Sequence, residues 1–191
     1  MGIITNVGTS HIELLGSREA IAEAKGELIR CLPENSVAIL NEDDPYVKAM
    51  DRLAKGKTIT YGIERNATCI GSHLRYKKDG IKFTCKCYDE VFDIFLPMIG
   101  EHNVYDALAA IVAGRVLGIK SNTIRKGLSE FSGTPMRQEI VPFEDIVILN
   151  DAYNANPSSM AEAIKALGQL EGKRKIAMLG DMLELGDFSE E

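Results

Sequence analysis

The chain has 191 residues, 45% of them hydrophobic, and a formal net charge of −6 from 22 basic and 28 acidic side chains. This composition is typical of a globular protein, and the acidic balance argues against nucleic acid or an anionic membrane surface as a partner. No apolar run is long enough to span a bilayer, and the amino terminus lacks the pattern of a secretory signal. We therefore expect a cytoplasmic protein without membrane insertion, and a monomer.

Apolar runs alternate with helical patterns over the first third of the chain. Buried strands are predicted at residues 3–8, 36–40 and 58–62. A helix is predicted at residues 17–32, where Ser17 suits the N-cap and apolar residues recur at helical spacing. Another helix should run from residue 41 to about 53. This β-α-β-α-β order indicates an α/β fold with a parallel sheet.

The pattern changes between residues 69 and 96, where short alternating runs are broken by polar turns. It predicts an antiparallel β-meander, inserted over about residues 66–98 and peripheral to the sheet. Helices are expected next at residues 101–117 and 122–131, each closed by a glycine or a proline-containing break.

The break Ser-Gly-Thr-Pro at residues 132–135 predicts a domain boundary, which divides the chain into residues 1–132 and 133–191. Beyond it, a helix is expected at residues 157–170. Strands are expected at residues 138–141, 146–149 and 175–179. These elements begin a second α/β unit.

Polar residues gather where the strand ending at residue 149 joins the following helix. Asn156 suits the N-cap and Pro157 the first helical position, so free N–H groups face the carboxyl edge of the sheet, where α/β folds bind ligands. Asp151, Tyr153 and Asn154 would project into the same crevice. A well-capped turn explains Asn156 without explaining the other polar side chains, and both interpretations stay open.

Lys25 lies four residues from both Ile21 and Ile29, close to the apolar side of its predicted helix. Burial favours the neutral amine, which can react with carbon dioxide to give a carbamate, an anionic metal ligand. With the imidazole of His11, such a group could hold Mg²⁺. The local pattern by itself favours the simpler alternative, a lysine that extends its ammonium group to solvent beside a turn histidine.

Two further polar positions are candidates for nucleotide contacts. Asn103 and Asp106 are three residues apart on one face of a predicted helix, where an asparagine could pair with adenine or simply begin a solvated helix. Arg137, just past the predicted boundary, could clamp a phosphate or be a surface charge.

Taken in order, these segments resemble the Mur ligase family, and within it the ligases that add D-alanyl-D-alanine to a UDP-linked muramyl tripeptide. The matching strings are Asn-Val-Gly at 6–8, Ala-Lys-Gly-Glu at 24–27, Gly-Glu-His-Asn at 100–103, Asp-Ala-Tyr-Asn-Ala-Asn-Pro at 151–157 and Leu-Gly-Asp-Met-Leu-Glu-Leu-Gly at 179–186. The resemblance implies part of a central ATP-binding domain of the P-loop type, followed by the start of a Rossmann-like C-terminal domain.

The resemblance also implies an activity. The parent enzyme would use ATP and Mg²⁺ to join UDP-N-acetylmuramoyl-tripeptide to D-alanyl-D-alanine through an acyl phosphate, in peptidoglycan synthesis. By matched position, His11 and a carbamylated Lys25 would hold Mg²⁺, Asn103 and Asp106 would lie by adenine, Arg137 would meet the γ-phosphate, Asp151 the ribose, and Tyr153, Asn154 and Asn156 would line the site between the domains.

The sequence departs from the family pattern in two places. The family's second asparagine on the adenine-binding helix is Asp106 here, and a carboxylate can accept from the adenine amino group but cannot donate to the ring nitrogen. No Gly-x-x-x-x-Gly-Lys-Ser/Thr loop occurs, although the family places one before the first strand. We therefore expect a fragment that by itself neither hydrolyses ATP nor ligates.

Two alternative functions stay open. One is another member of the same family, such as the folate polyglutamating ligase or the ligase that adds the third peptide residue, although the strings at 153–157 and 180–182 argue against both. The other is a non-catalytic binding module of the same fold, which the missing phosphate loop would suit.

Overall fold

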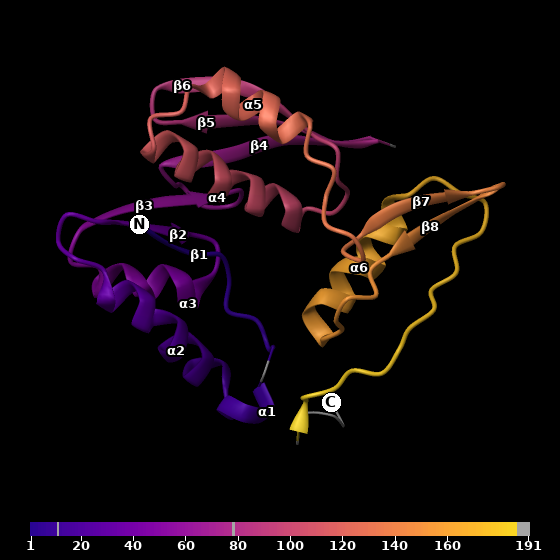
Figure 1. The fold of residues 1–191 in the computed structure, drawn as a ribbon, viewed down its shortest axis with the longest axis horizontal. Helices are drawn as coiled ribbons and strands as arrows, with labels where there is room; N and C mark the ends of the chain where they lie inside the picture. Colours follow the sequence, from indigo (N-terminus) through magenta and orange to yellow (C-terminus); the bar gives the residue numbers. More distant parts are fainter. Residues whose placement is uncertain (11, 78, 187–191) are drawn as a thin grey trace.

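The computed structural model describes residues 1–10, 12–77 and 79–186, which form two α/β units (Figure 1). The first unit contains one six-stranded sheet in the order β1-β2-β3-β4-β5-β6. Its strands are β1 (Gly2–Ile4), β2 (Val37–Asn41), β3 (Lys57–Gly62), β4 (Cys69–Lys77), β5 (Gly80–Cys87) and β6 (Glu90–Leu96). Strands β1 to β4 pair in parallel, and β4 to β6 pair antiparallel.

In the first unit, helices form at each of the predicted places, and one further short helix that was not predicted follows β1. They are α1 (Ile12–Leu15), α2 (Arg18–Cys31), α3 (Pro45–Lys48) with the 3₁₀ helix η1 (Ala49–Leu53), α4 (His102–Val116) and α5 (Ser121–Ser129). Ser17 caps α2, because its hydroxyl accepts a hydrogen bond of 3.1 Å from the backbone N–H of Ala20. Among the described residues, no helix is long and apolar enough to cross a bilayer.

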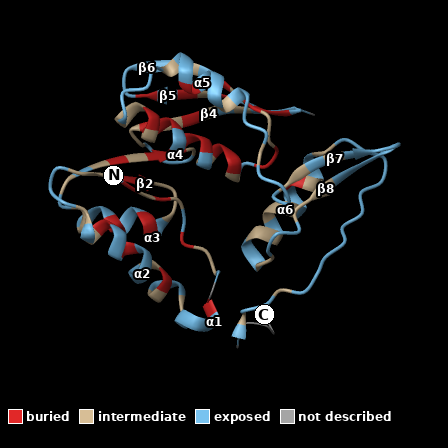
Figure 2. Ribbon diagram, viewed as in Figure 1, coloured by how far each residue is buried: buried red, intermediate tan, exposed pale blue. Residues whose placement is uncertain are grey.

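Helices cover both faces of the parallel strands. This is required because successive residues of these strands are apolar and their side chains point to opposite faces of the sheet. In β2, Ala38 and Leu40 pack in the core beside α2 and α3, whereas Ile39 packs in the core beneath α4. Figure 2 shows the buried residues concentrated on these strands and on the inner faces of the helices. The loops at the carboxyl ends of β1 and β2 are thereby held by a sheet buried on both sides.

The meander predicted at residues 66–98 forms as three antiparallel strands, but the expectation that it is peripheral is wrong. Tyr61 of β3 pairs in parallel with Cys69 of β4, so the meander continues the central sheet. Phe83 and Ile94 belong to the same buried core as Ile59, under α4. Alternation along a strand shows that one face is buried, but it does not reveal which strand lies beside it.

The second unit consists of a hairpin, β7 (Glu139–Phe143) and β8 (Ile146–Asn150), and helix α6 (Pro157–Gln169). The prediction of a strand at residues 175–179 is wrong, since that segment is extended but unpaired, with Met178 95% exposed. Figure 1 shows the reason: the segment runs away from β7 and β8 toward α1, where no strand of the described chain meets its backbone groups.

Candidate functional site

The two units meet at the loop that follows β1. The side-chain nitrogen of Asn156 donates a hydrogen bond of 3.1 Å to the hydroxyl oxygen of Ser10, and the backbone N–H of Glu13 donates to the carbonyl of Glu184 at 3.4 Å. A small hollow at this junction is lined by residues 9–10, 154–156 and 183–185. Segments from both ends of the chain therefore share one polar site.

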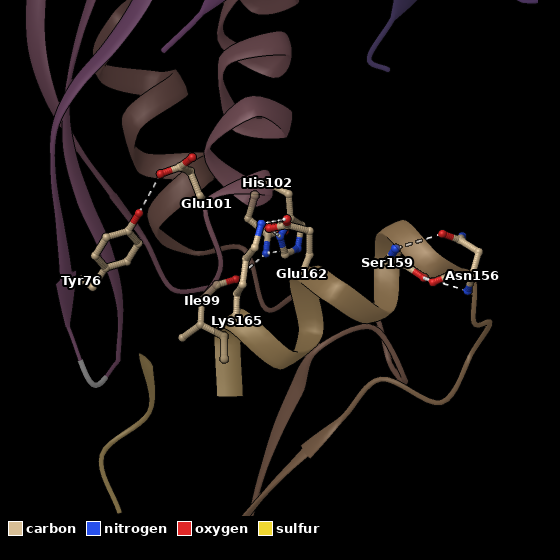
Figure 3. Close-up of polar contacts among 9 residues, drawn as sticks. Tyr76, Ile99, Glu101, His102, Asn156, Ser159, Glu162 and Lys165 are labelled. Carbon is tan, nitrogen blue, oxygen red and sulfur yellow. Dashed lines mark hydrogen bonds and ion pairs between the residues drawn. The ribbon is translucent and has the colours of Figure 1, made fainter. Parts of the chain in front are cut away.

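Asn156 makes two separate interactions. Its oxygen accepts from the backbone N–H of Ser159 at 2.9 Å, while the Ser159 hydroxyl accepts from the backbone N–H of Asn156 at 3.1 Å, which completes a capping box at the start of α6 (Figure 3). Its nitrogen reaches Ser10. The predicted helix cap is therefore confirmed, and the contact with Ser10 is an interaction that the sequence did not predict. Nearby, the side-chain oxygen of Asn154 accepts from the N–H of Ala155 at 2.9 Å.

Three of the expected site residues gather at the base of the β7–β8 hairpin. The guanidinium carbon of Arg137 lies 4.0 Å from the ring centroid of Tyr153, whose backbone N–H donates to the carbonyl of Met136 at 3.1 Å. The backbone N–H of Gln138 donates to a carboxylate oxygen of Asp151 at 3.3 Å. Arg137 is exposed but stacked on an aromatic ring, so its guanidinium plane is oriented rather than free.

At the start of α4, Asn103 is buried, with 7% of its surface exposed, so a solvated helix start does not describe it. Its side-chain nitrogen donates to the carbonyl of Ile99 at 2.6 Å and lies 3.0 Å from Nε2 of His102. Asp106, one turn further along, keeps solvent contact. Desolvation raises the pKa of the Asp106 carboxyl, and His102 opposes that shift.

Lys25 is exposed, but its amine donates a hydrogen bond of 2.8 Å to the carbonyl of Asn6 at the end of β1. Desolvation lowers the pKa of the amine, and the charge of Asp44 opposes that shift. A hydrogen-bond donor of this kind does not fit a metal ion, so Lys25 could ligate one only as a carbamate. His11 lies outside the described residues, and no group of three or more His, Cys, Asp or Glu in the described chain is placed to hold a metal.

Sequence reasoning missed several residues of this region. Ser10 and Gln138 lie next to residues that it singled out, and His102 belongs to a string that it matched without assigning a role. Glu162 on α6 has no local sequence signal; one carboxylate oxygen lies 2.7 Å from the amine of Lys165, and the other lies 4.0 Å from Nδ1 of His102. The contact with His102 is long-range, so spacing along the chain could not predict it.

A sheet and a second α/β unit that share a polar junction are typical of enzymes that bind ligands between two domains. Residues 1–114 match the family model of the Mur ligase middle domain, and residues 136–191 match that of the Mur ligase glutamate ligase domain. The chain belongs to the Mur ligase family.

Individual relatives are similar over nearly the whole chain. It is 43% identical, over 98% of its length, to the UDP-N-acetylmuramoyl-tripeptide--D-alanyl-D-alanine ligase of Bacillus subtilis (strain 168), of which it covers 40%. It superimposes on MurF from Acinetobacter baumannii with a TM-score of 0.92 at 31% identity, covering 98% of this chain and 41% of that one. The MurF ligase of Thermotoga maritima in complex with ADP gives a TM-score of 0.88 at 27% identity, covering 98% and 43%.

Proposed function

We propose that this chain is part of an ATP-dependent ligase that joins D-alanyl-D-alanine to UDP-N-acetylmuramoyl-tripeptide in peptidoglycan synthesis. The observation that carries the proposal is the 43% identity, over 98% of the chain, to a Bacillus subtilis enzyme named for that reaction. The proposed boundary between the central and C-terminal domains lies between residues 132 and 133. The complete protein would act as a cytoplasmic monomer and would contribute, through the cell wall, to cell division and cell shape.

In the proposed reaction a carboxylate oxygen of the tripeptide takes the γ-phosphoryl group of ATP, which gives an acyl phosphate and releases ADP. The amine of D-alanyl-D-alanine then attacks the acyl carbon, and inorganic phosphate leaves as the amine loses a proton. The residues of this chain would bind and orient the reactants. Ser10 and Asn156, in contact across the junction, support a site that closes between the two domains and excludes water from the acyl phosphate.

Adenine would lie at the start of α4, beside Asn103. The side-chain nitrogen of Asn103 is committed to Ile99 and His102, which leaves its oxygen to accept from the adenine amino group. Asp106 can act in the same sense, as an acceptor. A site with acceptors alone favours a base that carries an amino group at this position.

Arg137 and Asp151 would orient the phosphates and the ribose. A guanidinium already held on the ring of Tyr153 loses less side-chain freedom when it binds the γ-phosphate, and its planar donors suit phosphate oxygens. Asp151 sits beside Arg137 at the base of the same hairpin, where one carboxylate oxygen accepts from Gln138. Tyr153, Asn154 and Asn156 would line the site from the C-terminal side.

Mg²⁺ would need a change at Lys25, because its amine donates a hydrogen bond to the carbonyl of Asn6 and in that state does not fit a metal. Carbamylation would convert this amine into an anionic ligand beside Asn6, after the end of β1. Its lowered pKa, caused by desolvation, supports that reaction because it raises the fraction of neutral amine.

Two assays test the proposal together. The complete protein should release phosphate from ATP only when UDP-N-acetylmuramoyl-tripeptide and D-alanyl-D-alanine are both present, and the ligated product should appear by mass spectrometry. The 191-residue chain, titrated calorimetrically with a non-hydrolysable ATP analogue and Mg²⁺, should bind weakly, since it contains no Gly-x-x-x-x-Gly-Lys-Ser/Thr loop. A complete protein that fails to ligate would instead support a binding module.

A further inference from the structure

A chain of four groups connects α6 of the second unit to the start of α4 in the first (Figure 3). Glu162 of α6 faces His102, with 4.0 Å between a carboxylate oxygen and Nδ1. Nε2 of the same ring lies 3.0 Å from the side-chain nitrogen of Asn103, which donates to the carbonyl of Ile99 at 2.6 Å. The side chains of His102 and Glu162 are each about one third exposed, at 34% and 35%.

The hydrogen-bonding roles in this chain follow from its fixed end. The carbonyl of Ile99 can only accept, so the atom of Asn103 that faces it at 2.6 Å must be the nitrogen. A flipped amide would place two acceptor oxygens against each other. The second hydrogen of the amide then points at Nε2 of His102, which must accept it.

The tautomer of His102 is thereby determined. Because Nε2 accepts, the hydrogen of the neutral ring lies on Nδ1. Nδ1 is buried and has no hydrogen-bond partner within the described residues, and the group it faces is the carboxylate of Glu162. A negative charge on that side favours the tautomer with hydrogen on Nδ1, and so favours the orientation of Asn103 that turns its oxygen away from Ile99.

We propose that Glu162 is a positioning residue for the nucleotide base: through His102 it keeps the side-chain oxygen of Asn103 available to the adenine amino group. The inference rests on the proposed function, which places adenine at Asn103. It adds that recognition of the base depends on α6, and hence on how the second unit lies against the first. Glu162, without itself contacting the base, would thereby couple the arrangement of the two units to the selectivity for adenine.

The test uses the complete protein with ATP and with ITP, whose base carries an oxygen in place of the adenine amino group. Glu162→Ala should lower kcat/KM for ATP about threefold to fivefold through KM alone, as expected for a partly exposed carboxylate that faces the N–H of a neutral ring, and should leave kcat and the ITP constants unchanged. Glu162→Gln keeps an acceptor for the Nδ1–H group of His102, so its kcat/KM for ATP should fall less than that of Glu162→Ala. It also serves if the alanine variant does not fold.

Lys165→Ala is the matched control, because it removes the other partner of Glu162 from the same helix and leaves the contact with His102 intact. Its KM for ATP should not rise. Equal losses with ATP and ITP in Glu162→Ala, a fall in kcat, or a change smaller than twofold would overturn the inference. If the wild-type protein does not ligate, it is the proposed function that fails; if it ligates but uses ATP and ITP equally well, adenine does not contact Asn103 and the inference fails with that placement. If the wild type prefers ATP and Glu162→Ala keeps that preference, only the inference fails.

Discussion

The side-chain nitrogen of Asn156 donates a hydrogen bond of 3.1 Å to the hydroxyl of Ser10, which lies 146 positions earlier in the chain. The oxygen of the same amide caps α6 by accepting from the backbone N–H of Ser159. One side chain thus begins a helix with one atom and connects the two units with another. Because the two interactions use different atoms, substitutions can separate them.

Asn156→Ser should preserve the helix and weaken the connection. Serine supplies a capping oxygen but no amide nitrogen, so the free energy of unfolding should change by less than about 0.5 kcal/mol, whereas Asn156→Ala should cost about 1 kcal/mol. Both variants of the complete protein should lose about threefold to tenfold in ligation kcat/KM, the range expected for one hydrogen bond. Thermal unfolding and a ligation assay measure the two effects.

Ser10→Ala is the control from the other side of the bond. It should reproduce the loss of activity while leaving the stability of α6 unchanged, and combining it with Asn156→Ser should add little further loss. Full activity in Asn156→Ser would show that the hydrogen bond between the units is incidental.

Arg137→Lys should lower kcat/KM for ATP at least tenfold, although the charge is kept. An ammonium group neither stacks flat on the ring of Tyr153 nor offers the paired donors of a guanidinium to a phosphate. Tyr153→Phe keeps the ring and should leave kcat/KM for ATP nearly unchanged, whereas Tyr153→Leu removes the ring and should lower it severalfold. Steady-state kinetics of the complete protein check the series; a lysine variant with wild-type kinetics would remove Arg137 from the site.

Local patterns were sufficient to predict helices α2 to α6 and strands β1 to β3, but not the short helix α1. The first residues of α2 and α6 follow from the N-caps Ser17 and Asn156, because each cap accepts a hydrogen bond from a backbone N–H only three residues further on. The strand predicted at residues 175–179 did not form, because a strand also needs a partner for its backbone groups, and residue spacing carries no information about partners. The place of the meander in the central sheet was missed for the same reason.

The same limit applies to the candidate site, where local sequence predicts some residues but not the contacts between the two units. Asp151 and Tyr153 were predicted because they follow a strand end and Arg137 because it lies just past the predicted boundary, and the structure brings the three together at one hairpin. The burial of Asn103 depends on contacts outside its own helix face. The contact between Glu162 and His102 arises only when two units pack, so no local pattern predicts it.

Lys25 should be carbamylated in the complete, Mg²⁺-loaded protein. Desolvation lowers the pKa of its amine, which increases the neutral fraction that reacts with carbon dioxide. After equilibration with ¹³C-bicarbonate, a protein-bound carbamate resonance should appear that Lys25→Arg abolishes, together with at least a hundredfold loss of ligation. A bare amine in the loaded protein, seen by density or by the absence of that resonance, would rule out this role.

Asp43 ties the end of β2 to the connection between β3 and β4. Its carboxylate accepts from the backbone N–H groups of Ile63 at 2.6 Å, Glu64 at 3.0 Å and Arg65 at 2.9 Å, and from the hydroxyl of Tyr105 at 3.1 Å. Burial by itself would raise the pKa of Asp43, but these hydrogen bonds outweigh it, so the pKa lies below its ordinary value. The ionised form is therefore the one that stabilises the fold.

Asp43→Asn should destabilise the protein by about 1–3 kcal/mol at pH 7, because an amide nitrogen would face N–H donors and leave at least one without an acceptor. Since the folded pKa is depressed, the advantage of the wild type is complete above the unfolded pKa of about 3.9 and is lost as the pH falls through the lower folded value. Urea unfolding from pH 3 to 7 should show the two proteins converging at the acid end. Asp51→Asn, at an exposed position, is the control. A difference in the free energy of unfolding between wild type and Asp43→Asn that stays constant across this pH range would contradict the stabilising role of the ionised Asp43 carboxylate.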